Sequence, residues 1–172
     1  MNRLHLHLRV DDLAASRRFY SALFNAEPDV TKSDYAKWML DDPHINLAIS
    51  SRGAGAAGID HVGVQADTAE GLSALSQRLK AAEISTHDET AAECCYAVSD
   101  KHWARDPSGV VWEIFRTMGA AETYGDDDGR AALLAGETAQ PAAAENAAGP
   151  NARSQAHSNA RSKPGPMAGG CC

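Results

Sequence analysis

The feature that most constrains the fold is a plan that occurs twice along the chain. Residues 4–16 (LHLHLRVDDLAAS) and 59–71 (IDHVGVQADTAEG) both have the pattern of a strand, an aspartate and an amphipathic helix. At an offset of 56 residues, His5 aligns with His61 and Asp11 with Asp67. A repeated unit that cannot bury its apolar face alone is stabilised by packing against its neighbour. The chain is therefore predicted to fold as two copies of one module.

The first copy begins with leucines at every second position from 4 to 8, the period of a strand. Asp11 or Asp12 is then expected to cap a helix that ends near Phe24. The segments YAKWML and HINLAIS have the pattern of strands, and DDPH between them is typical of a turn. The predicted buried face of the helix consists of Leu13, Tyr20, Leu23 and Phe24.

The second copy has a predicted strand at 58–66 and a helix that starts at the capping-box pattern Asp67-x-x-Glu70. Strands are expected near 94–98, 101–105 and 110–116, with the turn Asp106-Pro107-Ser108-Gly109 before the last. The plan is βαβββ in each copy, which predicts an α+β fold. The predicted apolar face of the second helix consists of Leu72, Leu75 and Leu79.

The composition changes near residue 120. Residues 1–120 form the predicted domain, with modules at about 1–52 and 57–118. Residues 121–172 are dominated by Ala, Gly, Pro, Asn, Ser and charged residues, which bury too little apolar surface to offset the chain entropy of folding. We expect a disordered tail, with a short helix around 129–135 as its one regular segment.

Charge and hydropathy exclude several classes of partner. The formal net charge of −7 disfavours nucleic acid and anionic membranes, since both are bound by basic surfaces. The chain has no apolar run of eighteen residues and no signal-peptide pattern at its start. We expect a cytoplasmic protein with a small-molecule partner.

The four cysteines form two adjacent pairs, Cys94–Cys95 and Cys171–Cys172. Neighbouring Cα atoms are about 3.8 Å apart, whereas disulfides span roughly 4.4–6.8 Å, so free thiols in a reducing compartment are expected. Two neighbouring thiolates can instead bind one larger soft atom, such as trivalent arsenic, cadmium or mercury. The alternative for Cys94–Cys95 is a pair of small apolar side chains in a strand.

One carboxylate lies in an apolar strand. In the segment VVWEIF, Val111, Glu113 and Phe115 face one way, and Trp112 and Ile114 the other. A buried, unpaired carboxylate costs several kcal/mol, so Glu113 requires a cation.

The repeated strand starts, the DPSGVVWEIF hairpin and these histidine and glutamate positions resemble the vicinal oxygen chelate superfamily over residues 1–118. The resemblance implies a cup-shaped mixed sheet around a metal ion. Its ligand positions match His5, His61 and Glu113, with His7 as the alternative to His5. The fourth position, from aligning INLAIS with VWEIFR, falls on Leu47, which cannot bind a metal. Two imidazoles and a carboxylate suit non-haem Fe(II) with O₂, with Zn²⁺ and Ni²⁺ as alternatives and Mg²⁺ less suitable.

The segments ECCYAVSDKHW, HLHLRVDDL, IDHVGV and DPSGVVWEIF together resemble the carbon–arsenic lyases. These enzymes use Fe(II) and O₂ to cleave the carbon–arsenic bond of trivalent organoarsenicals, such as methylarsenite and trivalent aromatic arsenicals. The resemblance implies that Cys94 and Cys95 bind the arsenic and that His5, His61 and Glu113 bind the iron. Some members have Gln in place of His5, so the histidine here completes a triad of two histidines and one carboxylate.

Further side chains are candidates from their positions alone. Tyr96, Lys101 and His102 lie near the thiols in sequence and are candidate proton donors; the alternative is an exposed polar strand face. Cys171 and Cys172 are expected to be an exposed thiol pair that captures arsenicals, unless their pairing is incidental. Two other functions stay open: another metal-dependent extradiol dioxygenase or glyoxalase-like enzyme, and a non-catalytic arsenic- or cadmium-binding stress protein.

Overall fold

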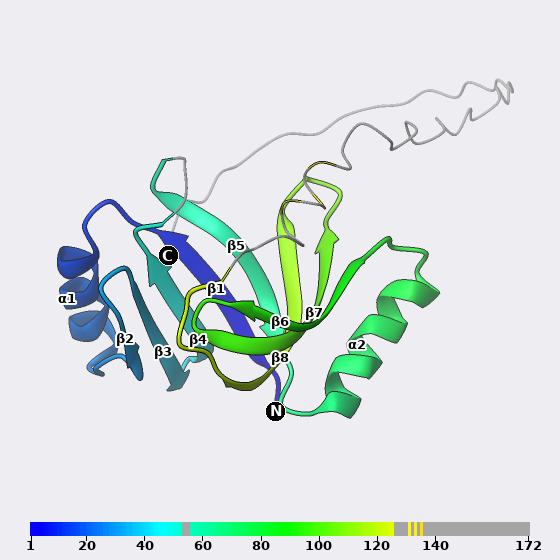
Figure 1. Cartoon of the computed structure of the whole chain (residues 1–172), viewed down its shortest axis with the longest axis horizontal. Coiled ribbons are helices and arrows are strands. Elements are labelled where there is room, and N and C mark those ends of the chain that lie inside the picture. Colours follow the sequence, from blue (N-terminus) through cyan, green and yellow to red (C-terminus); the bar gives the residue numbers. More distant parts are fainter. Residues whose placement is uncertain (53–55, 126–130, 132, 134, 136–172) are drawn as a thin grey trace, which may run out of the picture. The chain divides into compact units, whose positions relative to one another are not determined.

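A computed structural model describes residues 1–52 and 56–125, together with residues 131, 133 and 135. Its strands belong to one eight-stranded mixed sheet, which carries two helices (Figure 1). The predicted α+β fold with two βαβββ modules is confirmed. In chain order the elements are β1 (Arg3–Arg9), α1 (Leu13–Phe24), β2 (Val30–Thr31), β3 (Tyr35–Asp41), β4 (His44–Ser50), β5 (Gly58–Gln65), α2 (Ala69–Ala81), β6 (His87–Cys94), β7 (Ala97–Arg105) and β8 (Val111–Ala120).

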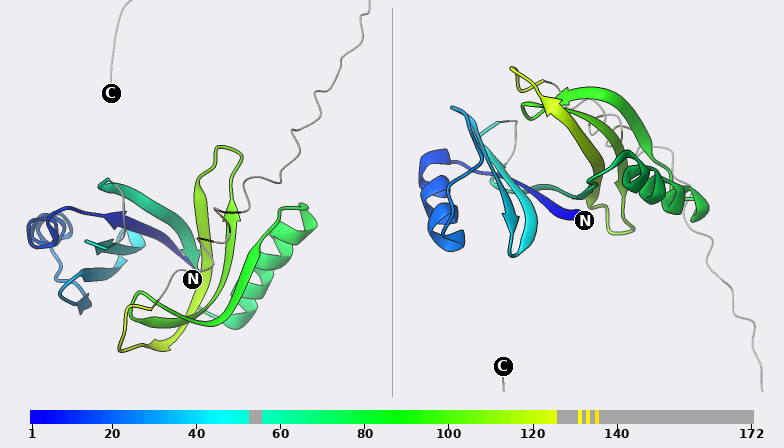
Figure 2. Two further views of the ribbon diagram at one scale, coloured as in Figure 1. Left: turned by 45° about the horizontal axis from the view of Figure 1, so that its top comes forward. Right: turned by 90° about the horizontal axis from the view of Figure 1, so that it is seen from below.

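The sheet has the strand order β2-β3-β4-β1-β5-β8-β7-β6. The first strands of the two modules, β1 and β5, pair antiparallel at its centre, and each pairs in parallel with the last strand of its own module. The sheet curls, and α1 and α2 cover its outer side (Figure 2). The first and last strands of both modules therefore lie side by side, with one face of each turned into the hollow of the sheet.

Two apolar clusters determine which side chains face that hollow. Under α1, Trp38, Leu47 and Ile49 are buried with Leu6 and Leu8 of β1 packed against them. Under α2, Leu72 and Ile114 are buried, with Leu75 and Leu79 packed against their cluster. Because side chains alternate along a strand, the histidines of β1 and Glu113 of β8 face the hollow instead. The predicted alternation in both strands is confirmed.

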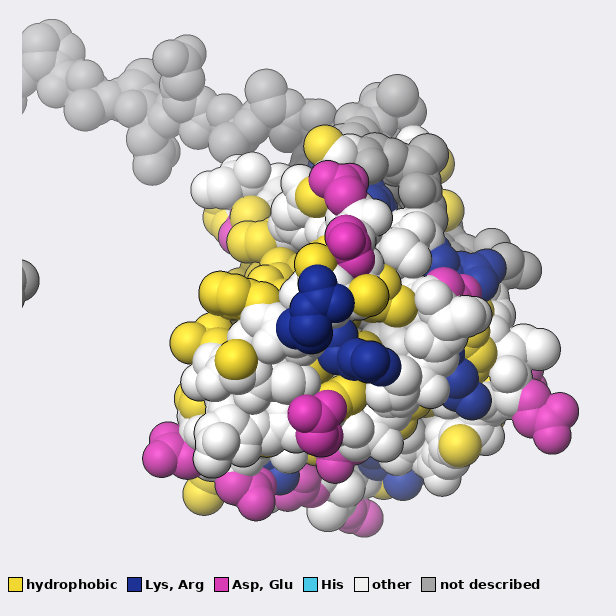
Figure 3. Space-filling view, turned by 90° about the vertical axis from the view of Figure 1, so that its left-hand side faces the viewer, with side chains coloured by type: hydrophobic (Ala, Val, Ile, Leu, Met, Phe, Trp, Pro, Cys, Tyr) yellow, Lys and Arg dark blue, Asp and Glu magenta, His cyan; other side chains and the backbone are white. Residues whose placement is uncertain are grey.

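The helix starts and faces differ in detail from prediction. Asp12 caps α1 as predicted, since its side chain accepts a hydrogen bond from the Ala15 amide. The cap of α2 is Thr68 and not Asp67, because the Thr68 hydroxyl accepts from the Gly71 amide while Asp67 pairs with the N-terminal amine. The predicted burial of Leu23 is wrong, since 60 % of its surface is exposed. Figure 3 views the side that carries α1 and shows apolar side chains among charged ones.

The cysteine pair does not lie within a strand. Strands were predicted at 94–98 and 101–105, but β6 ends at Cys94, Cys95 and Tyr96 form a turn, and β7 runs from Ala97 to Arg105 without a break. Cys95 and Tyr96 have φ angles of 57° and 61°, and Cys94 pairs with Ala97 across them. Two left-handed residues are the signature of a type I′ hairpin turn, usually built from Asn and Gly. Neither residue type is present here, so composition gave no sign of the turn.

A bulge in β5 also changes one predicted face. His7 pairs with His61, whereas the next residue, Leu8, pairs with Ile59, so Asp60 is the extra residue. Strict alternation along the strand would place Ile59 on the same face as His61, but the bulge turns Ile59 away, and it is 67 % exposed.

The predicted tail at 121–172 lies mostly outside the described residues, so its boundary and disorder stay predictions. Residues 121–125 follow β8 and return to the hairpin, where Gly125 forms a β-bridge with Cys94. Of the helix predicted around 129–135, residues 131, 133 and 135 are described, and all three are helical. Among the described residues, no helix is long and apolar enough to cross a membrane.

Because β5 approaches β8 closely at Gly63, adding one methyl group there is predicted to destabilise the fold. A Cβ on Gly63 would lie 2.1 Å from the backbone oxygen of Glu113, whereas a Cβ on Gly119 would meet nothing within 4 Å. We expect Gly63→Ala to lower the free energy of unfolding by about 1–3 kcal/mol. Gly119→Ala is the matched control and should change it by less than about 0.5 kcal/mol. Urea denaturation of both variants measures this, and equal midpoints would contradict the packing described.

Candidate metal centre and thiol pair

Three buried side chains from three adjacent strands converge in the hollow of the sheet. His5 on β1 lies opposite Gly63 on β5, and Gly63 lies opposite Glu113 on β8. The His5 Nε2 atom is 3.2 Å from the His61 Nε2 atom. The Glu113 Oε2 atom is 3.5 Å from the first of these nitrogens and 3.4 Å from the second. The structure therefore brings together the three residues that the sequence suggested as metal ligands.

The outer nitrogen of each imidazole has a hydrogen-bond acceptor. His5 Nδ1 lies 3.0 Å from the backbone oxygen of Asn46, and His61 Nδ1 lies 2.9 Å from the Asp60 carboxylate, which also pairs with Arg9. A carbonyl or carboxylate acceptor requires a proton on Nδ1 of the ring. Both Nε2 atoms then turn lone pairs toward each other and toward the carboxylate.

Charge in the site is balanced by one lysine. Burial lowers the pKa of His5 to about 3, so its ring is neutral near pH 7. Burial opposes ionisation of Glu113, but Lys101 and the two imidazoles hold its pKa well below the usual range. The Lys101 Nζ atom lies 2.7 Å from Glu113 Oε1, and Glu113 raises the pKa of this buried amine against the effect of burial. Glu113 is thus a carboxylate whose Oε2 atom faces the two imidazoles.

These residues fit a divalent first-row metal ion. With both imidazoles in their neutral forms, three electron-pair donors converge, an arrangement that a cation stabilises. Ligands about 2.0–2.1 Å from one such ion lie roughly 3.0–3.4 Å apart at right to tetrahedral angles, close to the separations found here. The three protein ligands would occupy one face of the metal's coordination sphere, which leaves its other positions open to other groups.

His7 is a fourth donor beside the triangle. The ligand nitrogens of His5, His7 and His61 all lie within 4.8 Å of one another. His7 Nε2 is 2.9 Å from the Ser50 hydroxyl, and its buried Nδ1 has no hydrogen-bond partner within the described part of the chain. His7 therefore stays the alternative ligand, on the side of the triangle nearer the thiols.

The fourth position predicted from the alignment is corrected. Leu47 faces α1 and belongs to the apolar cluster beneath it. The neighbouring residues that face the hollow are Asn46 and Ala48, which lie opposite His5 and His7. The Asn46 amide donates to Gln65 at 2.9 Å, while its buried Oδ1 atom has no hydrogen-bond partner among residues 1–52 and 56–125. Assigning Leu47 came from similarity of the strand sequences, which cannot determine register to one residue.

The thiol pair shares a cavity with the metal triangle. The Cys94 and Cys95 sulfurs are 3.0 Å apart, at the tip of the β6–β7 hairpin. The cavity is about 30 Å³ in volume, room for a group the size of a methyl, whereas an aromatic ring needs about 150 Å³. Both cysteines line it together with His5, Lys101 and Glu113.

Three tyrosine rings pack around the hairpin tip. The ring centroids of Tyr35, Tyr96 and Tyr124 lie 5.6–6.1 Å apart, each pair in edge-on or tilted contact. The Tyr96 hydroxyl donates to Asp34 at 2.7 Å, and Asp34 pairs with Arg52. The hairpin of the second module is thus tied to the edge of the first.

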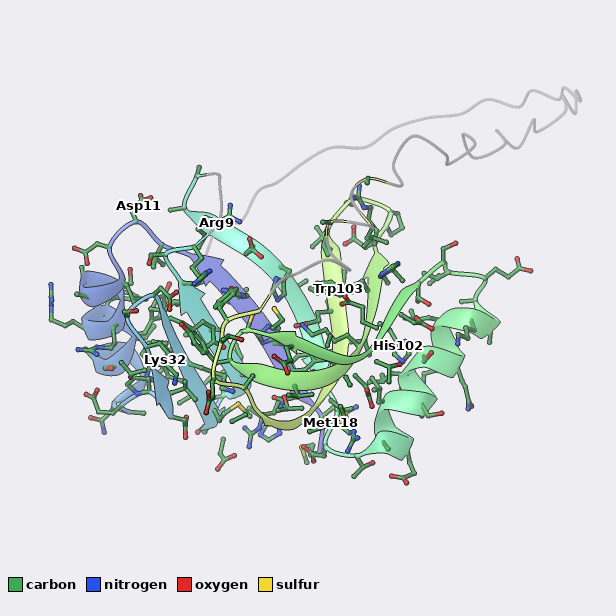
Figure 4. The ribbon with its side chains drawn as sticks, in the orientation of Figure 1. Arg9, Asp11, Lys32, His102, Trp103 and Met118 are labelled. Carbon is green, nitrogen blue, oxygen red and sulfur yellow. The ribbon has the colours of Figure 1, made fainter. Side chains whose placement is uncertain are left out.

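The three candidate proton donors occupy different places. Lys101 faces the cavity and pairs with Glu113. Tyr96 is engaged by Asp34 at the hairpin tip. His102 lies on the opposite face of β7, toward α2, where it pairs with Asp88, whereas its neighbour Trp103 packs against the His61 ring (Figure 4). Cys171 and Cys172 lie outside the described residues.

Sequence reasoning missed several residues that shape this site. Asp60 precedes His61 directly, and an acidic residue beside a candidate ligand is a usable signal of a supporting carboxylate. Asn46, Gly63 and Lys37 offered no comparable signal, since their importance comes from neighbours distant in sequence. Tyr124 was assigned to the tail by composition.

Because Asp60 supports His61, replacing Asp60 is predicted to lower the affinity for a metal ion. Asp60→Ala should weaken binding of a divalent ion about 10–100-fold, because His61 loses the acceptor that orients its ring. Asp41→Ala is the matched control, since Asp41 also pairs with an arginine of β1 but lies outside the site. Anaerobic titration calorimetry with Fe(II) or Co(II) measures both. Equal affinities would show that Asp60 does not support a metal ligand.

The electrostatics of the hairpin predict an unusually acidic thiol. The hydrogen bond from Cys94, with a contribution from His7, holds the pKa of Cys95 well below its usual range in spite of burial. The rate at which iodoacetamide alkylates Cys95 should therefore change little between about pH 8 and pH 6. The alkylation rate of an ordinary thiol falls by up to about 100-fold over the same decrease in pH. Mass mapping in a Cys171→Ser/Cys172→Ser chain measures this rate. Cys94→Ala, which has no side-chain donor, should restore the steep pH dependence if the hydrogen bond is its cause.

Comparison with known proteins agrees with the fold. The family model of the Glyoxalase/Bleomycin resistance protein/Dioxygenase superfamily matches residues 3–114. Among solved structures, the 2,3-dioxygenase LapB from Pseudomonas sp. KL28 has a TM-score of 0.53 at 21% identity, covering 73% of this chain and 44% of that one. At this identity the likeness concerns the fold alone.

Relatives with higher identity carry two kinds of name. The trivalent organoarsenical cleaving enzyme of Thermomonospora curvata is 35% identical over 86% of this chain and 98% of its own length. The enzyme of the same name from Bacillus sp. MD1 is 40% identical over 71% and 77%. The cadmium-induced protein CadI of Mycobacterium tuberculosis is 37% identical over 73% and 82%. With the family model, these relatives confirm the resemblance seen in the sequence: the chain belongs to the Glyoxalase/Bleomycin resistance protein/Dioxygenase superfamily.

Proposed function

We propose that the protein is an Fe(II)-dependent dioxygenase that cleaves the carbon–arsenic bond of trivalent organoarsenicals and releases inorganic arsenite. The observation that carries this proposal is the shared cavity, which Cys94 and Cys95 line together with His5 and Glu113. One group binds a soft trivalent atom, and the other binds a metal ion that activates O₂. The names of the organoarsenical-cleaving relatives support the same reaction.

The thiols would hold the substrate through arsenic. A monosubstituted trivalent arsenical has two exchangeable positions, which two adjacent thiolates fill at once. The remaining carbon–arsenic bond then lies in the cavity beside the metal triangle, so that reacting groups are positioned before the reaction. The volume of about 30 Å³ favours a methyl over an aryl substituent in this arrangement of the side chains.

Iron bound by His5, His61 and Glu113 would supply the site for binding and activating O₂. The overall reaction needs no other oxidant or reductant, because methylarsonous acid plus O₂ contains the atoms of arsenous acid plus formaldehyde. Lys101 keeps Glu113 ionised and screens its second oxygen. The buried rings of Trp103 and Phe115 beside the imidazoles keep bulk water from the reacting atoms.

A non-catalytic thiol site for cadmium or arsenite is the main alternative, and the cadmium-induced relatives favour it. The charges of the cavity favour a neutral arsenical instead. Lys37 and Lys101 both line it, so a second dication near the thiols would be repelled by two ammonium groups as well as by the metal ion. A different extradiol dioxygenase or glyoxalase-like activity would leave the thiol pair without a role.

Arsenic speciation over time tests the proposal. Anaerobic protein loaded with Fe(II) is mixed with methylarsenite and then exposed to air. We expect many turnovers to arsenite per protein that require Fe(II) and O₂. Cys94→Ser/Cys95→Ser and His61→Ala should each lower turnover by at least about 100-fold, since each removes a group that binds a reactant.

Two further arms identify the alternatives. Cys171→Ser/Cys172→Ser is the matched control for thiol loss and should keep turnover within about threefold of the unmodified protein. Stoichiometric binding of methylarsenite without release of arsenite would replace the lyase with a metalloid-binding protein. Full activity of the Cys94→Ser/Cys95→Ser chain on a catechol would indicate an extradiol dioxygenase.

A further inference from the structure

Lys37 lines the cavity of the thiol pair, and the cleavage reaction proposed for the site assigns it no chemical step. It is on β3, on the face of the sheet that lines the hollow, and pairs with Ala48 of β4. His7 of β1 pairs with the same Ala48 from the other side. The small Ala48 side chain thus separates the lysine from the histidine nearest the thiols. Lys37 lines the cavity together with both cysteines.

Lys37 is half-buried, and its ammonium group lacks an acceptor among the residues that the structure describes. Within the described part of the chain, no hydrogen bond or ion pair reaches it. The charged groups that act on it are Asp29 and Cys95, and the Asp29 carboxylate already accepts a hydrogen bond of 2.7 Å from the Met39 amide. Lys101, by contrast, is held by Glu113 at 2.7 Å. Lys37 is therefore the lysine of the cavity whose protons are not engaged by a protein acceptor.

Capture of the substrate by two thiols has a proton requirement of its own. When a thiolate attacks methylarsonous acid, one As–S bond forms and one As–O bond breaks, and arsenic stays trivalent. The departing hydroxide must gain a proton to leave as water. A second exchange also needs a base for the second thiol. Neither step involves iron or O₂, so the groups that serve the metal triangle do not supply these protons.

We propose that Lys37 is the acid–base group of this capture step, and this inference rests on the proposed binding of arsenic by Cys94 and Cys95. Lys37 gives a proton to the hydroxide that leaves when the Cys95 thiolate attacks. The neutral amine then takes the Cys94 proton and passes it to the second hydroxide. Two As–S bonds replace two As–O bonds, two waters leave, and Lys37 regains from solvent the proton that Cys95 lost on ionising.

Two physical properties suit Lys37 for this role. Burial lowers the pKa of Lys37 below that of an ordinary lysine, partly opposed by Asp29 and Cys95, so the amine exchanges protons more readily near neutral pH. The side chain lines the cavity of the thiols from the first module, whereas the hairpin that carries them belongs to the second. The two modules would thus each supply part of the capture chemistry.

The test measures rates of capture and release in the full-length chain. Anaerobic Fe(II)-loaded protein with Cys171→Ser/Cys172→Ser is mixed rapidly with methylarsenite, and unreacted thiols are counted after quenching. Release is measured by competition with excess dithiol. We expect Lys37→Met to slow capture and release together by at least about 10-fold, leaving the dissociation constant within about threefold. Equal slowing in both directions is the mark of a lost catalyst, because a structural defect changes the dissociation constant.

Two matched variants sharpen the result. Lys37→Arg keeps the positive charge but does not give up its proton, so it should be as slow as Lys37→Met. Lys32→Met removes an exposed lysine that lies 4.9 Å from the Tyr96 ring outside the cavity (Figure 4) and should leave both rates unchanged. Full rates in Lys37→Arg would mean that charge alone matters and would overturn the proton-transfer role.

The outcomes separate this inference from the proposed function. Rapid capture by the parent chain with unchanged capture in Lys37→Met would overturn the role of Lys37 and leave the lyase intact. Failure of the parent chain to bind methylarsenite at all would overturn both. Loss of affinity in Lys37→Met with an unchanged release rate would make Lys37 a structural residue and contradict the proposal.

Discussion

The convergence of three buried electron-pair donors governs the rest of this structure. The facing atoms of His5, His61 and Glu113 lie 3.2–3.5 Å apart, and each can offer an electron pair to a metal ion. Each group is positioned by a polar contact of its other polar atom. A backbone carbonyl contacts His5, the Asp60 carboxylate contacts His61, and the Lys101 ammonium contacts Glu113. A cation at the centre would convert mutual repulsion into shared attraction.

The duplicated fold explains how these donors meet. Each module places its first strand beside its last, and the antiparallel pairing of β1 with β5 joins the two modules at the centre of the sheet. The close approach of β5 to β8 depends on Gly63, where a side chain would clash with the Glu113 backbone. The site is therefore a product of the interface between modules, and neither module contains it alone.

The thiol hairpin is held against this centre by contacts from the opposite module. Asp34 binds the Tyr96 hydroxyl, and the rings of Tyr35 and Tyr124 pack around the turn. Both turn residues have left-handed backbone conformations that cost energy for non-glycine residues. That cost is compatible with a turn whose side chains are selected for chemistry instead of for turn propensity.

The sequence by itself determined the repeated βαβββ plan and the faces of β1 and β8, because alternation and helical periodicity are local properties. Its resemblance to a known superfamily singled out the converging residues His5, His61 and Glu113. The sequence did not determine the turn at Cys95 and Tyr96, the cap at Thr68 or the bulge at Asp60, each of which depends on a single backbone conformation. Only the tertiary structure placed Leu47 under α1 and Asn46 in the hollow, since a shift of one residue in register exchanges the faces of a strand. Only the tertiary structure brought Lys37 beside thiols that lie far from it in sequence, because proximity across a curled sheet leaves no periodic signal in the chain.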